Sequence, residues 1–123
     1  MNNSYDLELP DECPLDGSTL GNLEAYRIVK TNPPSAEDLL TYKELESLPK
    51  ANACKRVAIS IFTSYDKAKH RLDLSPHLGA DVAVIKLTPV HGPVSLSNHE
   101  SGHMSWWPYQ GMRKPEEFLV VKS

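Results

Sequence analysis

The chain has 123 residues, a length typical of one domain, and its 40% hydrophobic and 24% charged residues match an ordinary globular composition. The net charge of −3 gives no support for nucleic-acid binding. No apolar run approaches the ~20 residues needed to span a bilayer, and the N-terminus lacks a signal-peptide core, so we expect a cytoplasmic protein without a membrane span.

The first 22 residues are expected to form an acidic, loop-rich arm in front of a single domain at 23–123. Residues 1–26 hold six of the sixteen acidic residues and no Lys or Arg, whereas 27–123 hold ten acids and all thirteen Lys and Arg. Prolines and glycines interrupt the arm, at Pro10, Pro14, Gly17 and Gly21. The arm is either a solvated tail or a segment that lies across a basic, anion-binding cleft.

The two cysteines, Cys13 and Cys54, lack the C-x-x-C spacing of a zinc ribbon or a redox pair. We therefore expect two separate thiols and no disulfide framework.

The elements expected along the chain alternate between strands and short helices. Residues 24–30 alternate Tyr26 and Ile28 with Arg27, which predicts a strand with Arg27 on the face opposite those two residues. Ser35 and Asp38 resemble a capping box, which predicts a helix that fades before Pro49.

The second half of the chain is expected to be richer in strands. The apolar runs 57–62 and 82–87 predict buried strands, and 104–107 and 118–121 predict two shorter ones. Thr63 and Ser64 favour the start of a short helix in which Tyr65, Ala68 and Leu72 share one face. This order, with helices early and strands late, indicates an α+β fold.

Residues 99–103 read His-Glu-Ser-Gly-His and match the zinc-hydrolase string H-E-x-x-H. That chemistry requires a helix, because only the i, i+4 spacing turns both imidazoles toward one metal ion. Ser101 and Gly102 disfavour a helix and Pro108 follows closely, so we expect no metal site, and zinc hydrolysis remains an alternative function.

A second candidate is the group of His103, Trp106 and Trp107, which could form a shelf that stacks and orients a ligand. The alternative is that at least one of the two tryptophans belongs to the core. Arg27 is a further candidate, because a guanidinium binds phosphate or carboxylate through two hydrogen bonds, unless it simply faces solvent. Ser60 lies in a buried strand near its end, where hydroxyls commonly line ligand crevices.

Five stretches, in order, resemble the ADP-ribosyltransferase-like superfamily, which includes small bacterial toxins: A-Y-R-I-V-K, V-A-I-S-I-F-T-S, V-A-V-I-K-L-T-P, H-M-S-W-W-P and P-E-E-F-L-V-V. The resemblance implies an α+β domain with a split, partly antiparallel sheet and two or three short helices. It also implies an NAD-consuming ADP-ribosyltransferase or NAD glycohydrolase with NAD as substrate. The Ser-Thr-Ser triplet and the Glu-x-Glu motif of that superfamily are absent here.

The same resemblance implies roles for particular residues. Arg27 would hold the NAD diphosphate, Ser60 with Tyr65 or Trp106 would position the nicotinamide, and Glu117 would stabilise the oxocarbenium-like transition state. Catalytic residues would then be Glu117, Arg27 and Ser60, with Arg27, Ser60, Tyr65, His103 and Trp106 binding NAD. The alternative is a non-enzymatic binding or immunity-type protein with an unknown acceptor or partner.

Overall fold

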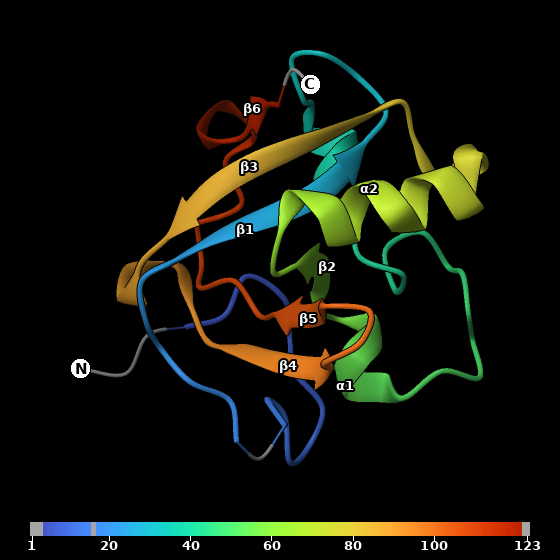
Figure 1. Ribbon diagram of the computed structural model, residues 1–123. Helices are drawn as coiled ribbons and strands as arrows, with labels where there is room; N and C mark the ends of the chain where they lie inside the picture. Colours follow the sequence, from blue (N-terminus) through green and yellow to red (C-terminus); the bar gives the residue numbers. More distant parts are fainter. Residues whose placement is uncertain (1–3, 16, 122–123) are drawn as a thin grey trace.

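Six strands in the order β4-β5-β2-β1-β3-β6 form one sheet in which each neighbouring pair is antiparallel. The computed structural model describes residues 4–15 and 17–121. The strands are β1 (Leu23–Val29), β2 (Ile59–Phe62), β3 (Asp81–Leu87), β4 (Val94–Asn98), β5 (His103–Trp106) and β6 (Leu119–Val120). The α-helices are α1 (Ala53–Arg56) and α2 (Tyr65–Leu74), and the 3₁₀ turns are η1 (Ala36–Leu39), η2 (Pro76–Leu78), η3 (Pro89–His91) and η4 (Pro115–Glu117). The expected α+β class is confirmed (Figure 1).

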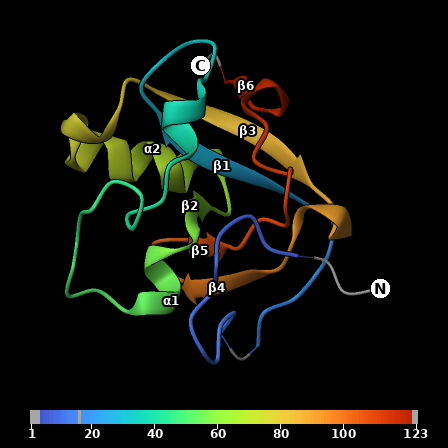
Figure 2. The same cartoon turned by 180° about the vertical axis from the view of Figure 1, so that it is seen from behind.

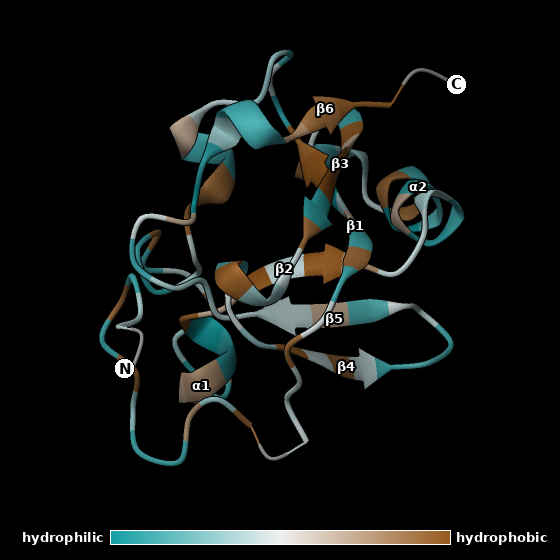
Figure 3. Ribbon diagram, turned by 90° about the vertical axis from the view of Figure 1, so that its left-hand side faces the viewer, coloured by the Kyte–Doolittle hydropathy of each residue, from teal (hydrophilic) through white to brown (hydrophobic). Residues whose placement is uncertain are grey.

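The sheet divides where β1 meets β2. β1 pairs with β3 along its whole length, from Leu23↔Leu87 to Val29↔Asp81, but it aligns with β2 through the single pair Tyr26↔Phe62. The half containing β1 and β3 therefore diverges from the half containing β2, β5 and β4, as Figure 3 shows from the side. The sequence analysis anticipated a split, partly antiparallel sheet. The six strands instead form one sheet that is antiparallel throughout and is split only in the sense that β1 and β2 pair at one position.

Each face of the sheet has its own cover. Helix α2 packs Ala68 and Leu72 against Phe62 and Val82, and we call this side the α2 face. Most of the core lies on the opposite side, the core face, which includes Ala25, Val29, Leu39, Ile59, Ile61, Ile85, Trp106 and Phe118. The turn η1 lies over the core face (Figure 2). Because side chains alternate along a strand, each residue of β2 or β5 belongs to one of these two faces.

The helix start predicted at Ser64 is confirmed, whereas the helix predicted from Ser35 is not. The Ser64 hydroxyl accepts a hydrogen bond from the Lys67 amide at 3.2 Å and begins α2. After Ser35 only the single 3₁₀ turn η1 forms, since the chain becomes extended at Leu40. The Asp38 carboxylate accepts hydrogen bonds from the amides of Ser35 and Lys30, which ties this turn to the end of β1.

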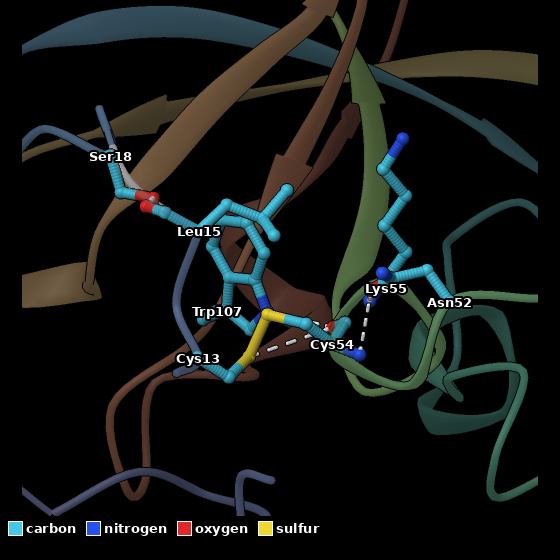
Figure 4. The surroundings of a disulfide bond; sticks show 7 residues. All are labelled: Cys13, Leu15, Ser18, Asn52, Cys54, Lys55 and Trp107. Carbon is cyan, nitrogen blue, oxygen red and sulfur yellow. Dashed lines mark hydrogen bonds between the residues drawn. A yellow bond between two sulfur atoms is a disulfide. The ribbon is translucent and has the colours of Figure 1, made fainter. Parts of the chain in front are cut away.

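The N-terminal arm packs against the domain. Cys13 and Cys54 form a disulfide with their Cα atoms 5.4 Å apart, so the expectation of two separate thiols is wrong. Figure 4 shows Trp107 beside this bond, and the Trp107 indole N–H donates to the Cys54 carbonyl at 2.9 Å. Leu15 lies on the same cluster, as do Tyr5, Leu7 and Leu9.

The apolar residues of the arm are not spaced with the period of a helix or a strand. The reason is that the arm has an irregular backbone and packs along the Trp107 cluster. The acid Asp16 lies outside the described residues. Within the described part of the chain, no helix is long and apolar enough to cross a membrane.

Candidate functional site

Ser60 and His103 meet on the α2 face of the sheet. The register between β2 and β5 places Ser60 opposite Ser105 and Phe62 opposite His103, so Ser60 and His103 are diagonal neighbours on one face. The Ser60 Oγ lies 2.5 Å from the His103 Nε2. Both residues are partly exposed, which leaves the pair open to solvent and to a ligand.

The His103 imidazole is held in its neutral form. Burial lowers the pKa of His103 below its ordinary value of 6.5, and the positive charges of Lys55 and Arg71 lower it further. In the tautomer with its ring hydrogen at Nδ1, a neutral imidazole accepts the Ser60 hydroxyl proton at Nε2, which is the arrangement that a general base requires. No acidic side chain within residues 4–15 and 17–121 hydrogen-bonds to that Nδ1, so the pair is a dyad and not a triad.

The helices supply cations to this region: the charges of Lys55 and Arg71 act on His103, and Lys67 contacts the hairpin turn. Lys67 and Arg71 are one turn apart on the same side of α2, and Lys55 extends from α1 away from the disulfide (Figure 4). The Lys67 ammonium donates to the Glu100 carbonyl at 2.5 Å, whereas Lys55 and Arg71 form no ion pair within the described residues. Two cations beside a neutral histidine make this surface suited to an anion.

The β4–β5 hairpin sets the position of His103. The Thr63 amide donates to the Gly102 carbonyl at 2.9 Å, which joins the hairpin turn to the end of β2. Gly102 has a φ of +69°, and a Cβ atom there would lie 2.7 Å from the Thr63 hydroxyl. The hairpin therefore cannot approach β2 this closely with another residue at position 102.

The H-E-x-x-H string lies on this hairpin, and its expected non-helical conformation is confirmed. His99 is exposed in the turn, whereas His103 begins β5 and bonds to Ser60. The helical spacing that would turn both imidazoles toward one zinc ion is absent from this segment. Among the described residues, no three His, Cys, Asp or Glu side chains form a group able to hold a metal ion.

Arg27 occupies the split between the two halves of the sheet. On the core face, its Nε donates to the Asp38 carbonyl at 2.7 Å and its NH1 donates to the Ser60 carbonyl at 2.6 Å. Burial lowers the pKa of Arg27 to about 10, while Tyr42 and Asp38 act in the opposite direction, so the guanidinium is charged at neutral pH. Two of the guanidinium's N–H donors are therefore used in hydrogen bonds to backbone carbonyls.

Glu117 contacts His91 and not Arg27 or Ser60. Its carboxylate lies 3.3 Å from the His91 Nε2, and the His91 Nδ1 accepts a hydrogen bond from the Thr88 amide at 3.0 Å. Because Nδ1 is an acceptor, the ring hydrogen is at Nε2 and points at Glu117. The His91 carbonyl in turn accepts from the Trp106 indole on the core face.

Arg27, Ser60 and Glu117 therefore do not share one face: the Ser60 hydroxyl is on the α2 face, and the other two contact the core face. Of the predicted NAD-binding residues, the structure brings Ser60 and His103 together. Tyr65 is partly buried against the Phe62 cluster. Trp106 is fully buried, so its predicted role as a ligand shelf is wrong.

Trp107 is also fully buried, and the alternative that the tryptophans belong to the core is confirmed for both. The sequence analysis missed Lys55 and Arg71. Arg71 could have been found from its spacing, since Lys67 and Arg71 are four residues apart and so lie on the same side of a helix.

No protein-family model, no curated protein and no solved structure matches this chain. The function is therefore argued from the site.

Proposed function

We propose that the domain binds a phosphate-bearing small molecule over Ser60 and His103 and transfers or hydrolyses a group of that molecule. The observation that carries this proposal is the contact between the Ser60 Oγ and the His103 Nε2 in a partly exposed position. The positive charges of Lys55 and Arg71 act on His103, and among the described residues neither side chain forms an ion pair. A serine hydroxyl is a weak nucleophile by itself and becomes effective when an adjacent base accepts its proton.

The proposed reaction begins with substrate binding at Lys55 and Arg71, which hold the anionic group. His103 takes the proton from the Ser60 hydroxyl through Nε2 while Oγ attacks the electrophilic atom of the substrate. The imidazole then gives the proton to a leaving group that departs as an anion, or to water when the leaving group departs neutral, as nicotinamide does from NAD. Water releases the group from Ser60 by the reverse sequence.

The two cations give substrate binding a second role. Lys55 and Arg71 disfavour a proton on His103, so in the free protein the imidazole is a weaker base than an ordinary histidine. A bound phosphate offsets those charges, which raises the pKa of His103 and favours proton transfer from Ser60. His103 is thus most effective as a base when the anionic substrate is present.

NAD is the first substrate to test, because the ADP-ribosyltransferase resemblance names it and its diphosphate suits the two cations. Ser60 and His103 are two of the residues which that resemblance implies in NAD binding. Glu117, the implied carboxylate, is not part of the proposed site.

The experiment follows the His103 imidazole by NMR as pyrophosphate, ADP-ribose or NAD is added, together with nicotinamide release from NAD. We expect the pKa of His103 to rise toward 6.5 when the anion binds, with a smaller rise in Lys55→Gln and Arg71→Gln. Ser60→Ala and His103→Gln should lower turnover about 100-fold or more.

The matched control is His99→Gln, an exposed histidine in the adjacent turn, which should leave turnover unchanged. The proposal is wrong if none of the three anions binds at millimolar concentration or shifts the His103 resonances. A loss of turnover in His99→Gln equal to that in His103→Gln would instead support the zinc-hydrolase alternative.

A further inference from the structure

A surface cavity of about 240 Å³ lies between the N-terminal arm and α1, and the proposed reaction does not use it. The arm forms one wall through Glu8, Leu9 and Pro10. The opposite wall comes from Lys43, Arg56 and Val57, with Ala53 beside them. Helix α1 separates the two sites, since its Lys55 acts on His103 and its Ala53 and Arg56 line the cavity.

The cavity holds two cations that the fold orients but does not neutralise. The Arg56 Nε donates to the Ser47 carbonyl at 3.2 Å, and the Arg56 carbonyl accepts from the Lys43 amide at 3.1 Å. Within the described residues, neither Arg56 nor Lys43 forms an ion pair, and Glu8 forms none either. The lining therefore has a net charge of +1 from two cations and one carboxylate.

The rest of the lining is apolar and is fixed in place. Leu9, Pro10 and Val57 offer hydrocarbon surface, and Val57 is only 2% exposed. The Cys13–Cys54 disulfide and the packing of Leu9 on the Trp107 cluster hold the arm against α1 (Figure 4). A wall that exists before binding lowers the entropic cost of holding a ligand.

We propose that this cavity binds a small monocarboxylate that carries an aliphatic or aromatic group. The Arg56 guanidinium forms an ion pair with the ligand's carboxylate. Among the described residues of the free protein, this half-buried guanidinium has no carboxylate partner. Leu9 and Pro10, which are partly exposed, contact the apolar part. A single negative charge neutralises the net charge of the lining, whereas a phosphate dianion would leave the occupied cavity with an excess negative charge. The volume is below the 300–1,000 Å³ typical of drug-sized sites, which selects a small molecule.

The experiment compares benzoate, hexanoate, benzamide and inorganic phosphate by calorimetry and by NMR shift mapping on the oxidised full-length chain. We expect benzoate and hexanoate to bind one per chain, with shifts at Leu9 and Val57, and to bind at least tenfold more tightly than benzamide or phosphate. Arg56→Gln should reduce benzoate affinity about tenfold, and Lys43→Gln should reduce it by a smaller factor. The exposed control Lys50→Gln should bind as wild type.

Arg56→Gln removes a hydrogen bond to the Ser47 carbonyl and could therefore disturb the fold. Lys43→Gln provides a second test, because Lys43 is exposed and its side chain makes no hydrogen bond within the described residues. Equal binding of benzoate and benzamide would overturn the proposal, as would unchanged affinity in both cavity variants. Ser60→Ala and His103→Gln should leave benzoate binding intact, so failure of the proposed reaction and failure of this site are separable.

Discussion

Arg27 and Ser60 are joined by a hydrogen bond of 2.6 Å from the guanidinium NH1 to the Ser60 carbonyl, across the split between β1 and β2. The same guanidinium donates to the Asp38 carbonyl. Where the two halves of the sheet diverge, Arg27 supplies the donor to the Ser60 carbonyl of β2, and it also ties the turn η1 to the sheet through the Asp38 carbonyl. The Ser60 hydroxyl remains on the other face, bonded to His103.

Arg27→Ala is expected to destabilise the fold by about 3 kcal/mol, because it leaves two carbonyls at the split without their donor. Arg27→Lys should recover part of this loss, since an ammonium keeps the charge but lacks the planar pair of donors. Urea denaturation measures both variants. If Arg27→Ala keeps wild-type stability and loses only NAD binding, Arg27 binds the NAD diphosphate, as the family resemblance implies.

Acid is expected to weaken the fold through His103. Its pKa is lower in the folded chain than the ordinary 6.5, so between those two values the unfolded chain binds more protons. The free energy of unfolding therefore falls as the pH drops below about 6.5. His103→Gln should remove this contribution, which chemical denaturation at pH 5 to 8 can measure. His77→Gln, at an exposed site in η2, is the control.

The activity of the Ser60–His103 pair should persist below the pH at which an ordinary histidine becomes protonated. A base must be neutral to accept the Ser60 proton, and the lowered pKa keeps His103 neutral in mildly acidic solution. The pH dependence of kcat/KM reports the free protein and should show its acid limb below pH 6.5. An acid limb above 6.5 would contradict the environment described for His103.

Breaking the Cys13–Cys54 bond is expected to lower stability by about 3–4 kcal/mol, because the bond closes a loop between residues 41 apart. Cys13→Ser should match the reduced wild type, and reductant should not affect the variant further. Trp107 is fully buried beside the bond, so its fluorescence should shift to longer wavelength as the arm loosens. Equal stability of the oxidised and reduced wild type would show that packing alone holds the arm.

Removing residues 1–15 should likewise expose Trp107, because Leu7, Leu9 and Leu15 pack on its cluster. The arm also donates the Asp6 amide to the Pro108 carbonyl at 3.0 Å and pairs Tyr5 with Tyr109. A truncated chain with native fluorescence and stability would show that the arm is not needed to bury Trp107.

Gly92→Ala is expected to be severely destabilising, whereas Gly21→Ala should be close to neutral. Gly92 has a φ of +115°, and a Cβ atom there would lie 2.2 Å from the Trp107 carbonyl oxygen. Gly21 has open space around it. Thermal unfolding of both variants provides the comparison, and a mild effect at Gly92 would mean that the segment before β4 can shift.

The sequence alone determined much of the local structure. Period-two alternation identified β1 and the face of Arg27, and β-branched apolar runs identified β2 and β3, because a buried strand must present such residues. Ser64 marked the start of α2 through its own side-chain hydrogen bond, which needs no distant partner. The glycine and the serine of 99–103 likewise indicated that this segment is not a helix.

Tertiary structure decided everything that depends on contacts between distant segments. The contact between Ser60 and His103 joins residues 43 apart through strand register, and the disulfide joins residues 41 apart through the path of the arm. The packing of Leu9 and Trp107 follows an irregular segment that has no periodicity to read. A sequence pattern reports which groups prefer burial or a given backbone conformation, whereas the partner of each group is fixed only when the sheet and its loops close around it.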